Sequence, residues 1–390
     1  MNTKSHHVIL VFVVIAIIGL IGYLEIKKPS RFESEIQTIA IAPPSAPAKN
    51  ATSSSITASE DRSIILKEKK ATYSPAKELS GIQGYINVSP PFTLASLVGK
   101  KVILIDFWTY SCINCQRTTP YLNAWYEKYK DKGLVIVGVH TPEFEFEKNY
   151  DNVARAVKQA GITYPVVLDS NYGTWNAYSN RYWPHKYLID IDGYIVDDHI
   201  GEGNYDTTEQ AIQTALAERQ TVLHLKDSID MGIVSPANMI PMDFSHVASP
   251  EIYFGSARNE YFGNGKQGVV GSQTLLLPQR MSENMLYLDG TWNFEDEFAE
   301  NTSDSARIIF NYNAKNVYIV ASSLQGVVIK VTRDGKLLGP EAGKDVAQDG
   351  TVLIKDDRLY ELIHGSDYGQ HRIEIEIKGR RFHGFAFTFG

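Results

Sequence analysis

The pattern of apolar and polar residues first indicates an α/β domain. Residues 101–108 (KVILIDFW) and 133–140 (GLVIVGVH) are nearly continuous apolar runs. Such runs are typical of strands that are buried on both faces of a sheet. Helical spacing of apolar residues predicts a helix between them at 114–129 and a second helix at 152–161, and a further strand follows at 164–169. Strands and helices therefore alternate along this part of the chain.

The same domain continues with a short helix, a hairpin and a last helix. The helix is predicted at 172–180 and the hairpin at 185–201, with an Asp-Gly pair at its turn. Residues 206–219 form the last helix, and Asp206 is its expected N-cap. This order predicts the thioredoxin fold with one inserted unit.

The pattern changes twice outside this α/β domain, which we place at 76–219. Residues 29–75 include a Pro/Ala/Ser-rich stretch and are expected to be a flexible linker. After a connector at 220–248, residues 249–390 alternate apolar and polar positions between turn residues. This second pattern predicts an all-β, jelly-roll-like sandwich.

The amino terminus contains an apolar run, residues 8–24, which carries no charge. Its length is close to the minimum for a membrane span, so residues 1–28 are expected to be a membrane anchor. A cleaved signal peptide and a buried core helix are the alternatives. Lys4 precedes the run and three basic residues follow it, so the positive-inside count does not favour export of the carboxyl side.

Composition excludes some classes of function. The chain of 390 residues has a formal net charge of −7, which argues against a nucleic-acid-binding protein because no basic stripe is available for phosphates. It contains only two cysteines, Cys112 and Cys115. Two residues cannot form a disulfide framework, so a close pair indicates a redox or a metal site.

The surroundings of the two cysteines separate these possibilities. A zinc site needs four ligands, and only His140 and His185 are available to join the pair in space. Covalent haem attachment needs histidine after Cys115, where Gln116 stands. An inert buried pair is a further alternative. Thiol–disulfide exchange is the leading interpretation, because the pair follows a strand and opens a helix.

Each neighbouring residue has an expected role in that chemistry. Cys112 falls at the start of the helix, where free N–H groups stabilise a thiolate, and Cys115 can resolve the mixed disulfide. Asp106 lies in an apolar strand and is expected to accept a proton; the alternative is a partly exposed residue at the strand end. Pro120 should kink the helix.

These residues resemble thioredoxins. Asp106-Phe107-Trp108, Cys112-x-x-Cys115 and Pro120 have the thioredoxin spacing. The segment GKKVILIDFWTYSCINCQRTTPYL resembles the DipZ/TlpA-like thioredoxins more narrowly, and SPEIYFGSARNEYFGN, LDGTWNFEDEF and GFAFTFG resemble the carboxyl-terminal part of DipZ proteins. The resemblance covers residues 78–390.

The resemblance implies further site residues. Pro184 corresponds to the cis proline that faces the cysteines in this family, although by sequence alone it fits an ordinary trans turn. Trp183 precedes it, and Trp183, Pro184 and Trp108 are expected to contact substrate. The expected redox group is the Cys112–Cys115 disulfide, with no other cofactor and no metal.

The expected function is that of a thiol–disulfide oxidoreductase, working as a reductant. We expect it to be held by one span in a bacterial inner membrane, with its domains in the periplasm acting on extracytoplasmic protein disulfides. DipZ proteins are usually fused to a multi-helix electron-carrying membrane domain. The resemblance therefore implies that a separate carrier of the CcdA/DsbD type serves this chain.

Two alternatives stay open. Thr109-x-x-Cys112 resembles the thiol peroxidase motif, but Ile105 stands where that motif has proline. The second alternative is a glycan- or protein-binding module with an accessory redox domain, in which Trp292, Tyr253 or Tyr261 would be exposed aromatic contacts. Aromatic residues in β-sandwiches more often belong to the core.

Overall fold

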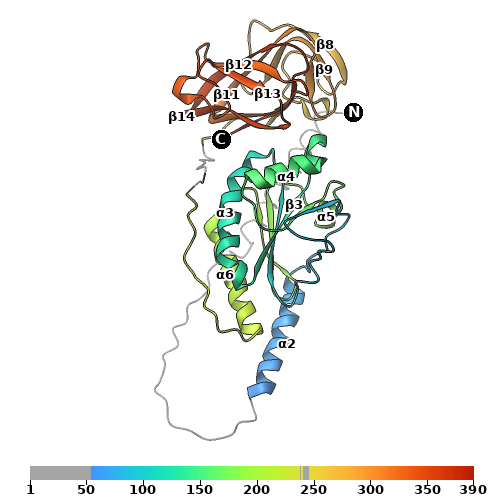
Figure 1. Cartoon of the computed structure of the whole chain (residues 1–390), viewed down its shortest axis with the longest axis vertical. Coiled ribbons are helices and arrows are strands. Elements are labelled where there is room, and N and C mark those ends of the chain that lie inside the picture. Colours follow the sequence, from blue (N-terminus) through green and yellow to red (C-terminus); the bar gives the residue numbers. More distant parts are fainter. Residues whose placement is uncertain (1–53, 238, 240–245) are drawn as a thin grey trace, which may run out of the picture. The chain divides into compact units, whose positions relative to one another are not determined.

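The computed structural model describes residues 54–237, 239 and 246–390. Residues 60–390 form one compact unit, in which an α/β domain comes first and a β-rich domain follows (Figure 1). The predicted membrane anchor, residues 1–28, lies outside the described residues. Among the residues that are described, no helix is both long and apolar enough to cross a membrane.

The α/β domain is built on a six-stranded sheet with the strand order β1-β4-β3-β2-β5-β6. β2 pairs in parallel with β3 and antiparallel with β5. Every residue of β2 is buried, which explains its continuous apolar sequence. The strands are β1 (Gly84–Ile86), β2 (Val102–Trp108), β3 (Leu134–His140), β4 (Val166–Leu168), β5 (His185–Ile189) and β6 (Ile195–Ile200).

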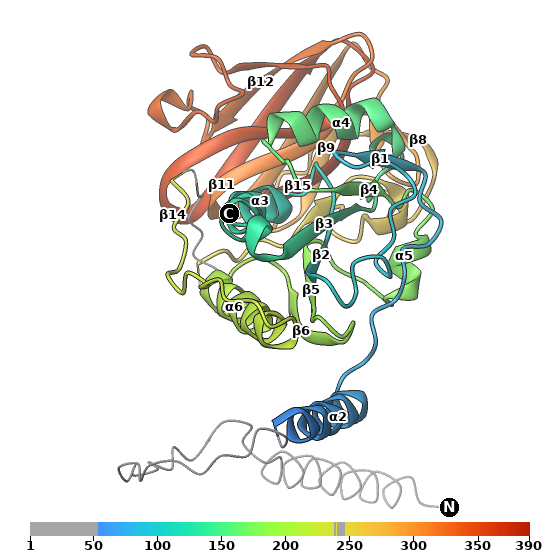
Figure 2. The ribbon, with the colours of Figure 1, turned by 60° about the horizontal axis from the view of Figure 1, so that its bottom comes forward.

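Helices cover both faces of this sheet (Figures 1 and 2). On one face, α3, α4 and α6 share a core around Trp125; on the other, α5 shares a core around Phe107 and Trp175. The helices are α3 (Ile113–Tyr129), α4 (Tyr150–Gln159), α5 (Gly173–Ala177) and α6 (Tyr205–Val222), with 3-10 turns at η1 (Lys130–Lys132) and η2 (Glu145–Lys148).

The order of elements confirms the predicted thioredoxin-like fold. One detail differs at the last helix. Asn204, in a left-handed conformation, is the N-cap of α6, so Asp206 lies in the first turn instead of capping it. A carboxylate in the first turn still interacts favourably with the helix dipole.

Part of the predicted flexible linker is instead helical, because residues Ser54–Thr72 form helix α2. This segment contains no glycine or proline, and its second half, SIILKEKKAT, consists mostly of Ile, Leu, Lys and Glu, whereas the Pro-rich composition ends before the helix. Lys69 ties the helix to the hairpin and to α6. Its ammonium lies 2.6 Å from Asp190 and 2.8 Å from Asp192, and it also contacts Glu218.

The carboxyl-terminal β domain contains nine strands and two 3-10 turns, and the described part of residues 223–248 before it contains neither helix nor strand. The strands are β7 (Ile252–Tyr253), β8 (Gly271–Leu275), β9 (Leu286–Phe294), β10 (Ala299–Asn301), β11 (Ser305–Ser322), β12 (Val327–Arg333), β13 (Thr351–Ile354), β14 (Arg358–Lys378) and β15 (His383–Phe389), and the turns are η3 (Ser256–Arg258) and η4 (Gly339–Glu341).

These strands do not form the two separate sheets expected of a sandwich. They are hydrogen-bonded as one sheet, because the long strand β11 pairs with β14 along its length and with β9 and then β15 on its other side. Register shifts occur in β11 between residues 314 and 318, where bulges allow a strand to bend. The apolar faces enclose one core.

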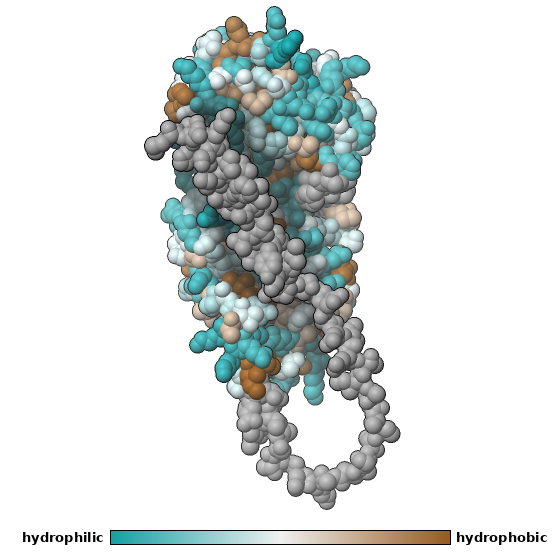
Figure 3. All heavy atoms as spheres, turned by 180° about the vertical axis from the view of Figure 1, so that it is seen from behind, coloured by the Kyte–Doolittle hydropathy of each residue, from teal (hydrophilic) through white to brown (hydrophobic). Residues whose placement is uncertain are grey.

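The aromatic residues considered as glycan contacts are not free surface groups. Trp292 is fully buried, and its indole N–H donates to the carbonyl of Asp289. Tyr253 bonds to Glu143 and Glu251, and Tyr261 packs against the domain core. Figure 3 shows one face of the molecule, where apolar residues lie in small groups among hydrophilic ones.

Candidate active site

Cys112 is the N-cap residue of α3, at the junction predicted from the sequence. Its sulfur accepts a hydrogen bond from the backbone N–H of Cys115 at 3.3 Å, and it is only partly buried. Both cysteines are free thiols. A sulfur at this end of a helix meets backbone N–H groups that have no partner within the helix. Cys112 is therefore placed to be the attacking thiol.

Cys115 lies one turn further along α3 and is only 2% exposed. Burial raises the pKa of its thiol well above the usual range, and the hydrogen bond and charge of Cys112 and the charge of Asp106 raise it further. The thiol therefore stays protonated at neutral pH. It needs a base before it can attack a mixed disulfide.

Asp106 is the carboxyl group placed to act as that base. It lies on β2, is 2% exposed, and its Oδ1 atom has no hydrogen-bond partner in the described structure. Burial raises its pKa to about 7, while the charge of Lys186 acts in the opposite direction. The alternative of a partly exposed strand-end residue is wrong, because both faces of β2 are covered.

Lys186 is a residue of the site that the sequence analysis missed. It lies opposite Asp106 in the antiparallel pair of β2 and β5, and its ammonium donates to the carbonyl of Gly201 at 2.9 Å. Burial lowers its pKa. A lysine within an apolar strand is unusual and could have drawn attention to Lys186. Its position opposite Asp106, however, follows only from the register of β5 with β2.

Two further buried charges extend this group. Glu202 follows β6, and its carboxylate lies 3.1 Å from the guanidinium of Arg117 on α3. Burial raises the pKa of Glu202, whereas Arg117 and Lys186 lower it. The side-chain charges near the cysteines thus alternate between negative and positive in the order Asp106, Lys186, Glu202 and Arg117. Attraction between opposite charges offsets part of the free-energy cost of burying them.

Trp183 and Pro184 face Cys112 as the resemblance implied. The bond between them is cis, and the carbonyl of Trp183 lies 3.9 Å from the sulfur of Cys112. The indole of Trp183 stacks near Trp175, with ring centroids 4.3 Å apart, and donates to the carbonyl of Thr141. These contacts fix the backbone beside the nucleophile.

Trp108 lies at the end of a buried strand, whereas Pro120 lies inside the helix that carries the cysteines. Trp108 ends β2, is 5% exposed, and packs edge-on against His140, so it offers little surface to a substrate. Trp108 also lines the cleft between α3, α4 and residues 356–359, and the expected substrate contact there stays a prediction. Pro120 lies inside α3, after the first turn that carries the cysteines.

Glu147 is a second residue that sequence reasoning missed. It is fully buried in η2 and accepts hydrogen bonds from the hydroxyl of Ser111 at 2.6 Å and from the N–H groups of Glu143 and Phe144. Burial raises its pKa to about 6. The carboxylate joins the loop before Cys112 to the segment after β3.

The residues considered for other chemistry have different partners. The imidazole of His140 stacks on Tyr110, and burial lowers its pKa to about 3, while His185 bonds to Asn180 and Asp198. The Thr109 side chain is fully buried with its hydroxyl 3.4 Å from Nε2 of His140, which does not favour the peroxidase interpretation.

The described residues do hold one group of carboxylates at metal-binding distances, formed by Asp190, Asp192 and Glu218. Lys69 lies against all three of them. A lysine ammonium thus provides the positive charge within this group. The group belongs to the attachment of α2.

Comparison with known families agrees with this geometry. Residues 88–216 match the Redoxin family model, and residues 249–390 match the model of the thioredoxin-like C-terminal domain. Protein DipZ of Mycobacterium tuberculosis is 41% identical over 319 residues, which are 81% of this chain and 43% of that protein. The chain therefore spans less than half the length of this relative.

This chain covers most of the length of two shorter relatives. The thiol-disulfide oxidoreductase YkuV of Bacillus subtilis is 30% identical over 146 residues, 37% of this chain and 97% of its own length. The thiol-disulfide oxidoreductase ResA of Bacillus cereus is 33% identical over 135 residues, 32% of this chain and 75% of its own length. Together with the cysteine pair and the fold, these matches show that the chain belongs to the DipZ/TlpA-like thioredoxin family, whose shorter relatives are named thiol-disulfide oxidoreductases.

Proposed function

We infer that this protein is a membrane-tethered reductant of disulfides in extracytoplasmic proteins. The observation that carries the proposal is the arrangement of a partly exposed Cys112 at the head of α3 with a buried Cys115 and a buried Asp106 behind it. The apolar run at 8–24 supports tethering. Cys112 and Cys115 provide the redox group, and the proposal needs no metal or other cofactor.

The exchange runs in two balanced steps. The Cys112 thiolate attacks one sulfur of a substrate disulfide, forms a mixed disulfide, and releases the other substrate sulfur as a thiolate that takes up a proton. Cys115 then loses its proton to the Asp106 carboxylate and attacks the sulfur of Cys112. The substrate leaves with its second sulfur reduced, and two electrons have passed from the enzyme dithiol to the substrate disulfide.

A reducing direction fits the residues around the pair. Ile113 and Asn114 bring no positive charge or histidine that would hold the Cys112 thiolate. Strongly oxidising pairs have an unusually stable reduced form. The oxidised pair must be reduced again, and we propose a dithiol of a separate membrane electron carrier of the CcdA/DsbD type as the donor.

Trapping of reaction intermediates tests the proposal. Cys115→Ser should accumulate mixed disulfides through Cys112, because the resolving step is blocked, whereas Cys112→Ser should form none. Separation of the trapped complexes under non-reducing conditions, followed by identification of the partners, gives the readout. Complexes of Cys112→Ser through Cys115 would reverse the assignment, and partners confined to the cytoplasm would contradict the extracytoplasmic role.

A further inference from the structure

Ile113, the residue between the two cysteines that follows the nucleophile, is covered by the β domain. It is 3% exposed and belongs to an apolar cluster with Phe144 of the α/β domain. The other buried members of the cluster come from the β domain and are Tyr318, Val320, Leu359, Phe385 and Ala386. The side of the redox pair on which Ile113 lies is therefore closed by residues more than 200 positions away in the sequence.

Polar contacts hold the β domain against the segment that follows β3. The guanidinium of Arg258 lies 2.8 Å from the carboxylate of Glu143, and the hydroxyl of Tyr253 donates to the same carboxylate at 3.0 Å. Arg258 also lies over the ring of Tyr253, 3.7 Å from its centroid. Nearby, the N–H of Glu145 donates to Glu297 at 2.8 Å. The contact thus combines apolar burial with a partly shielded ion pair.

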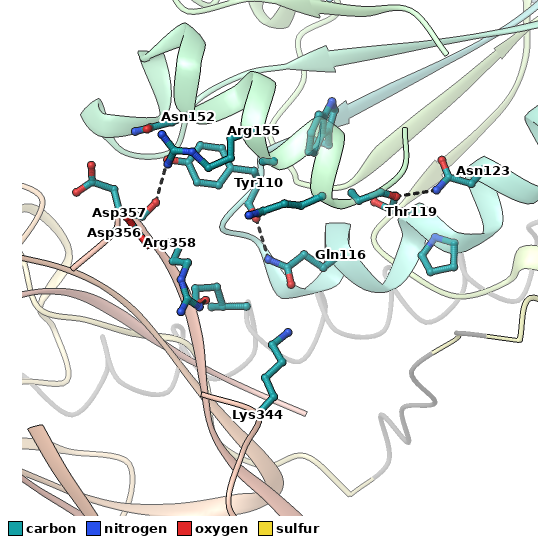
Figure 4. A pocket seen from close by; sticks show the side chains of 16 residues that line it. Tyr110, Gln116, Thr119, Asn123, Asn152, Arg155, Lys344, Asp356, Asp357 and Arg358 are labelled. Atoms are coloured by element: carbon teal, nitrogen blue, oxygen red, sulfur yellow. Dashed lines mark hydrogen bonds between the residues drawn. The ribbon is translucent and has the colours of Figure 1, made fainter. Parts of the chain in front are cut away.

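A second set of contacts lies beside the cysteine loop. The hydroxyl of Tyr110, two residues before Cys112, donates to the carbonyl of Asp357 at 3.1 Å (Figure 4). Behind this bond, a cleft of about 660 Å³ separates α3 and α4 from Lys344 and residues 356–359. The β domain is therefore held at the redox pair by a small number of contacts, which single substitutions can loosen.

The loop that meets Cys112 through the carbonyl of Trp183 is partly exposed. Tyr182 is 50% exposed, Arg181 is exposed, and Asn114 and Trp183 are partly exposed. This loop therefore offers a solvent-exposed approach to Cys112, whereas the side on which Ile113 lies is covered. On the covered side Asp357 contacts Tyr110 and Leu359 belongs to the cluster of Ile113, so a broad rigid surface around a disulfide has less room there.

We propose that the β domain is a wall of the active site that selects disulfides in flexible or extended polypeptide segments over disulfides that lie flush in a rigid folded surface. The specificity-determining contacts are those of the apolar cluster that contains Ile113, Leu359 and Phe385, supported by the Arg258–Glu143 pair. The inference rests on the oxidoreductase activity of the family, and it is independent of the direction of electron flow and of membrane attachment.

Alkylation of Cys112 tests the wall without requiring turnover. In the Cys115→Ser protein, Cys112 is the single thiol, and its rate constants with N-ethylmaleimide and with a bulky polyethylene-glycol maleimide can be compared. Arg258→Ala removes the ion pair, and Phe385→Ala removes the apolar contact. Arg380→Ala is the matched control, because it breaks an exposed pair with Asp304 in the same domain.

We expect the bulky reagent to react more slowly than the small one relative to their rates with free cysteine. Arg258→Ala and Phe385→Ala should each reduce this difference about fivefold, the effect of weakening one such contact on a closed–open equilibrium. Arg380→Ala should leave it unchanged. Two results would overturn the proposal. One is that both reagents react with the parent protein at the same rate relative to free cysteine, and the other is that the rate difference between the reagents is the same in all three variants.

Two disulfide substrates separate this proposal from the redox function. With both cysteines present, the protein should reduce a flexible single-disulfide peptide faster than a folded domain whose disulfide is flush with its surface, and Arg258→Ala should narrow that ratio. Equal rates on both substrates would overturn the wall and leave the redox function standing. Selective alkylation without reduction of either substrate would support the wall and contradict the function.

Discussion

The buried carboxyl of Asp106 links proton transfer at Cys115 to the stability of the fold. Its pKa is raised to about 7 by burial, so the folded protein keeps a proton that the unfolded chain releases near pH 4. Stability therefore falls as the pH rises from about 4 to 7 and stays lower above that range. Lys186 offsets only part of this loss.

Asp106→Asn should separate the two effects. We expect the resolving step to slow by roughly ten- to a hundredfold near pH 7, because general base catalysis is lost. We expect the free energy of unfolding above pH 7 to rise by ~1–3 kcal/mol, because the buried charge is removed. Rapid-mixing rates across pH and urea titrations at pH 5 and pH 8 measure these quantities. Full activity together with lower stability would indicate a purely structural carboxyl group.

The sequence was sufficient to predict some of these side chains and not others. Cys112, Cys115 and Asp106 could be placed because their spacing falls on one strand and the helix after it. Lys186 could not be placed, since its position opposite Asp106 depends on the pairing of β2 with β5. Glu202 could not be placed either, since its approach to Arg117 and Lys186 depends on the turn after β6. The burial of Ile113 could not be predicted, because nothing in the local sequence indicates which residues cover it.

Helix α2 depends on ion pairs for its attachment to the hairpin and α6. The ammonium of Lys69 is surrounded by three carboxylates, whose hydrogen bonds and charges raise its pKa, although burial acts against them. Removal of the cation leaves Asp190, Asp192 and Glu218 close together with like charge, and among the described residues Arg62 is the cation that still pairs with Asp192 and Glu218. The helix should then detach more readily.

Lys69→Ala is expected to lower the free energy of unfolding by ~1–3 kcal/mol and to speed proteolysis within 60–75. Lys70→Ala is the matched control, because Lys70 is the adjacent exposed lysine. Limited proteolysis and thermal melts of both variants provide the measurement. Identical behaviour of the two variants would show that the carboxylate group does not hold α2.

Element prediction succeeded where one local signal dominated. The buried strands β2 and β3 and helix α3 begin and end within about one residue of their predicted bounds, because continuous apolar runs and helical spacing are local properties. It failed for α2, whose helix-forming residues follow directly after a Pro-rich stretch.

The β domain covers apolar side chains of the α/β domain, so its removal should lower the stability of the α/β domain. Ile113 and Phe144 are buried by that domain, and full burial of such a side chain stabilises by about 1.5–3 kcal/mol. A chain lacking residues 249–390 should therefore melt at a lower temperature and bind a hydrophobic dye. It should still reduce small disulfides, because Cys112, Cys115 and Asp106 all lie outside the deleted part.

The same truncated chain carrying Ile113→Ser and Phe144→Ser should bind less dye, which shows that these two side chains form the exposed surface. Equal dye binding by the full and truncated chains would contradict a covering role. Loss of small-disulfide reduction in a truncated chain that is still folded would assign chemistry to the β domain.

The reduction potential of the Cys112–Cys115 pair tests the proposed reductant role most directly. Equilibration of the protein with glutathione buffers, with the thiol content read by alkylation, gives this value. We predict a potential near that of reducing thioredoxins, about −270 mV, because no group between the cysteines stabilises the reduced form and Asp106 can accept the proton of Cys115. A potential well above about −180 mV would contradict the account, because the pair would then accept electrons from most protein thiols that it meets.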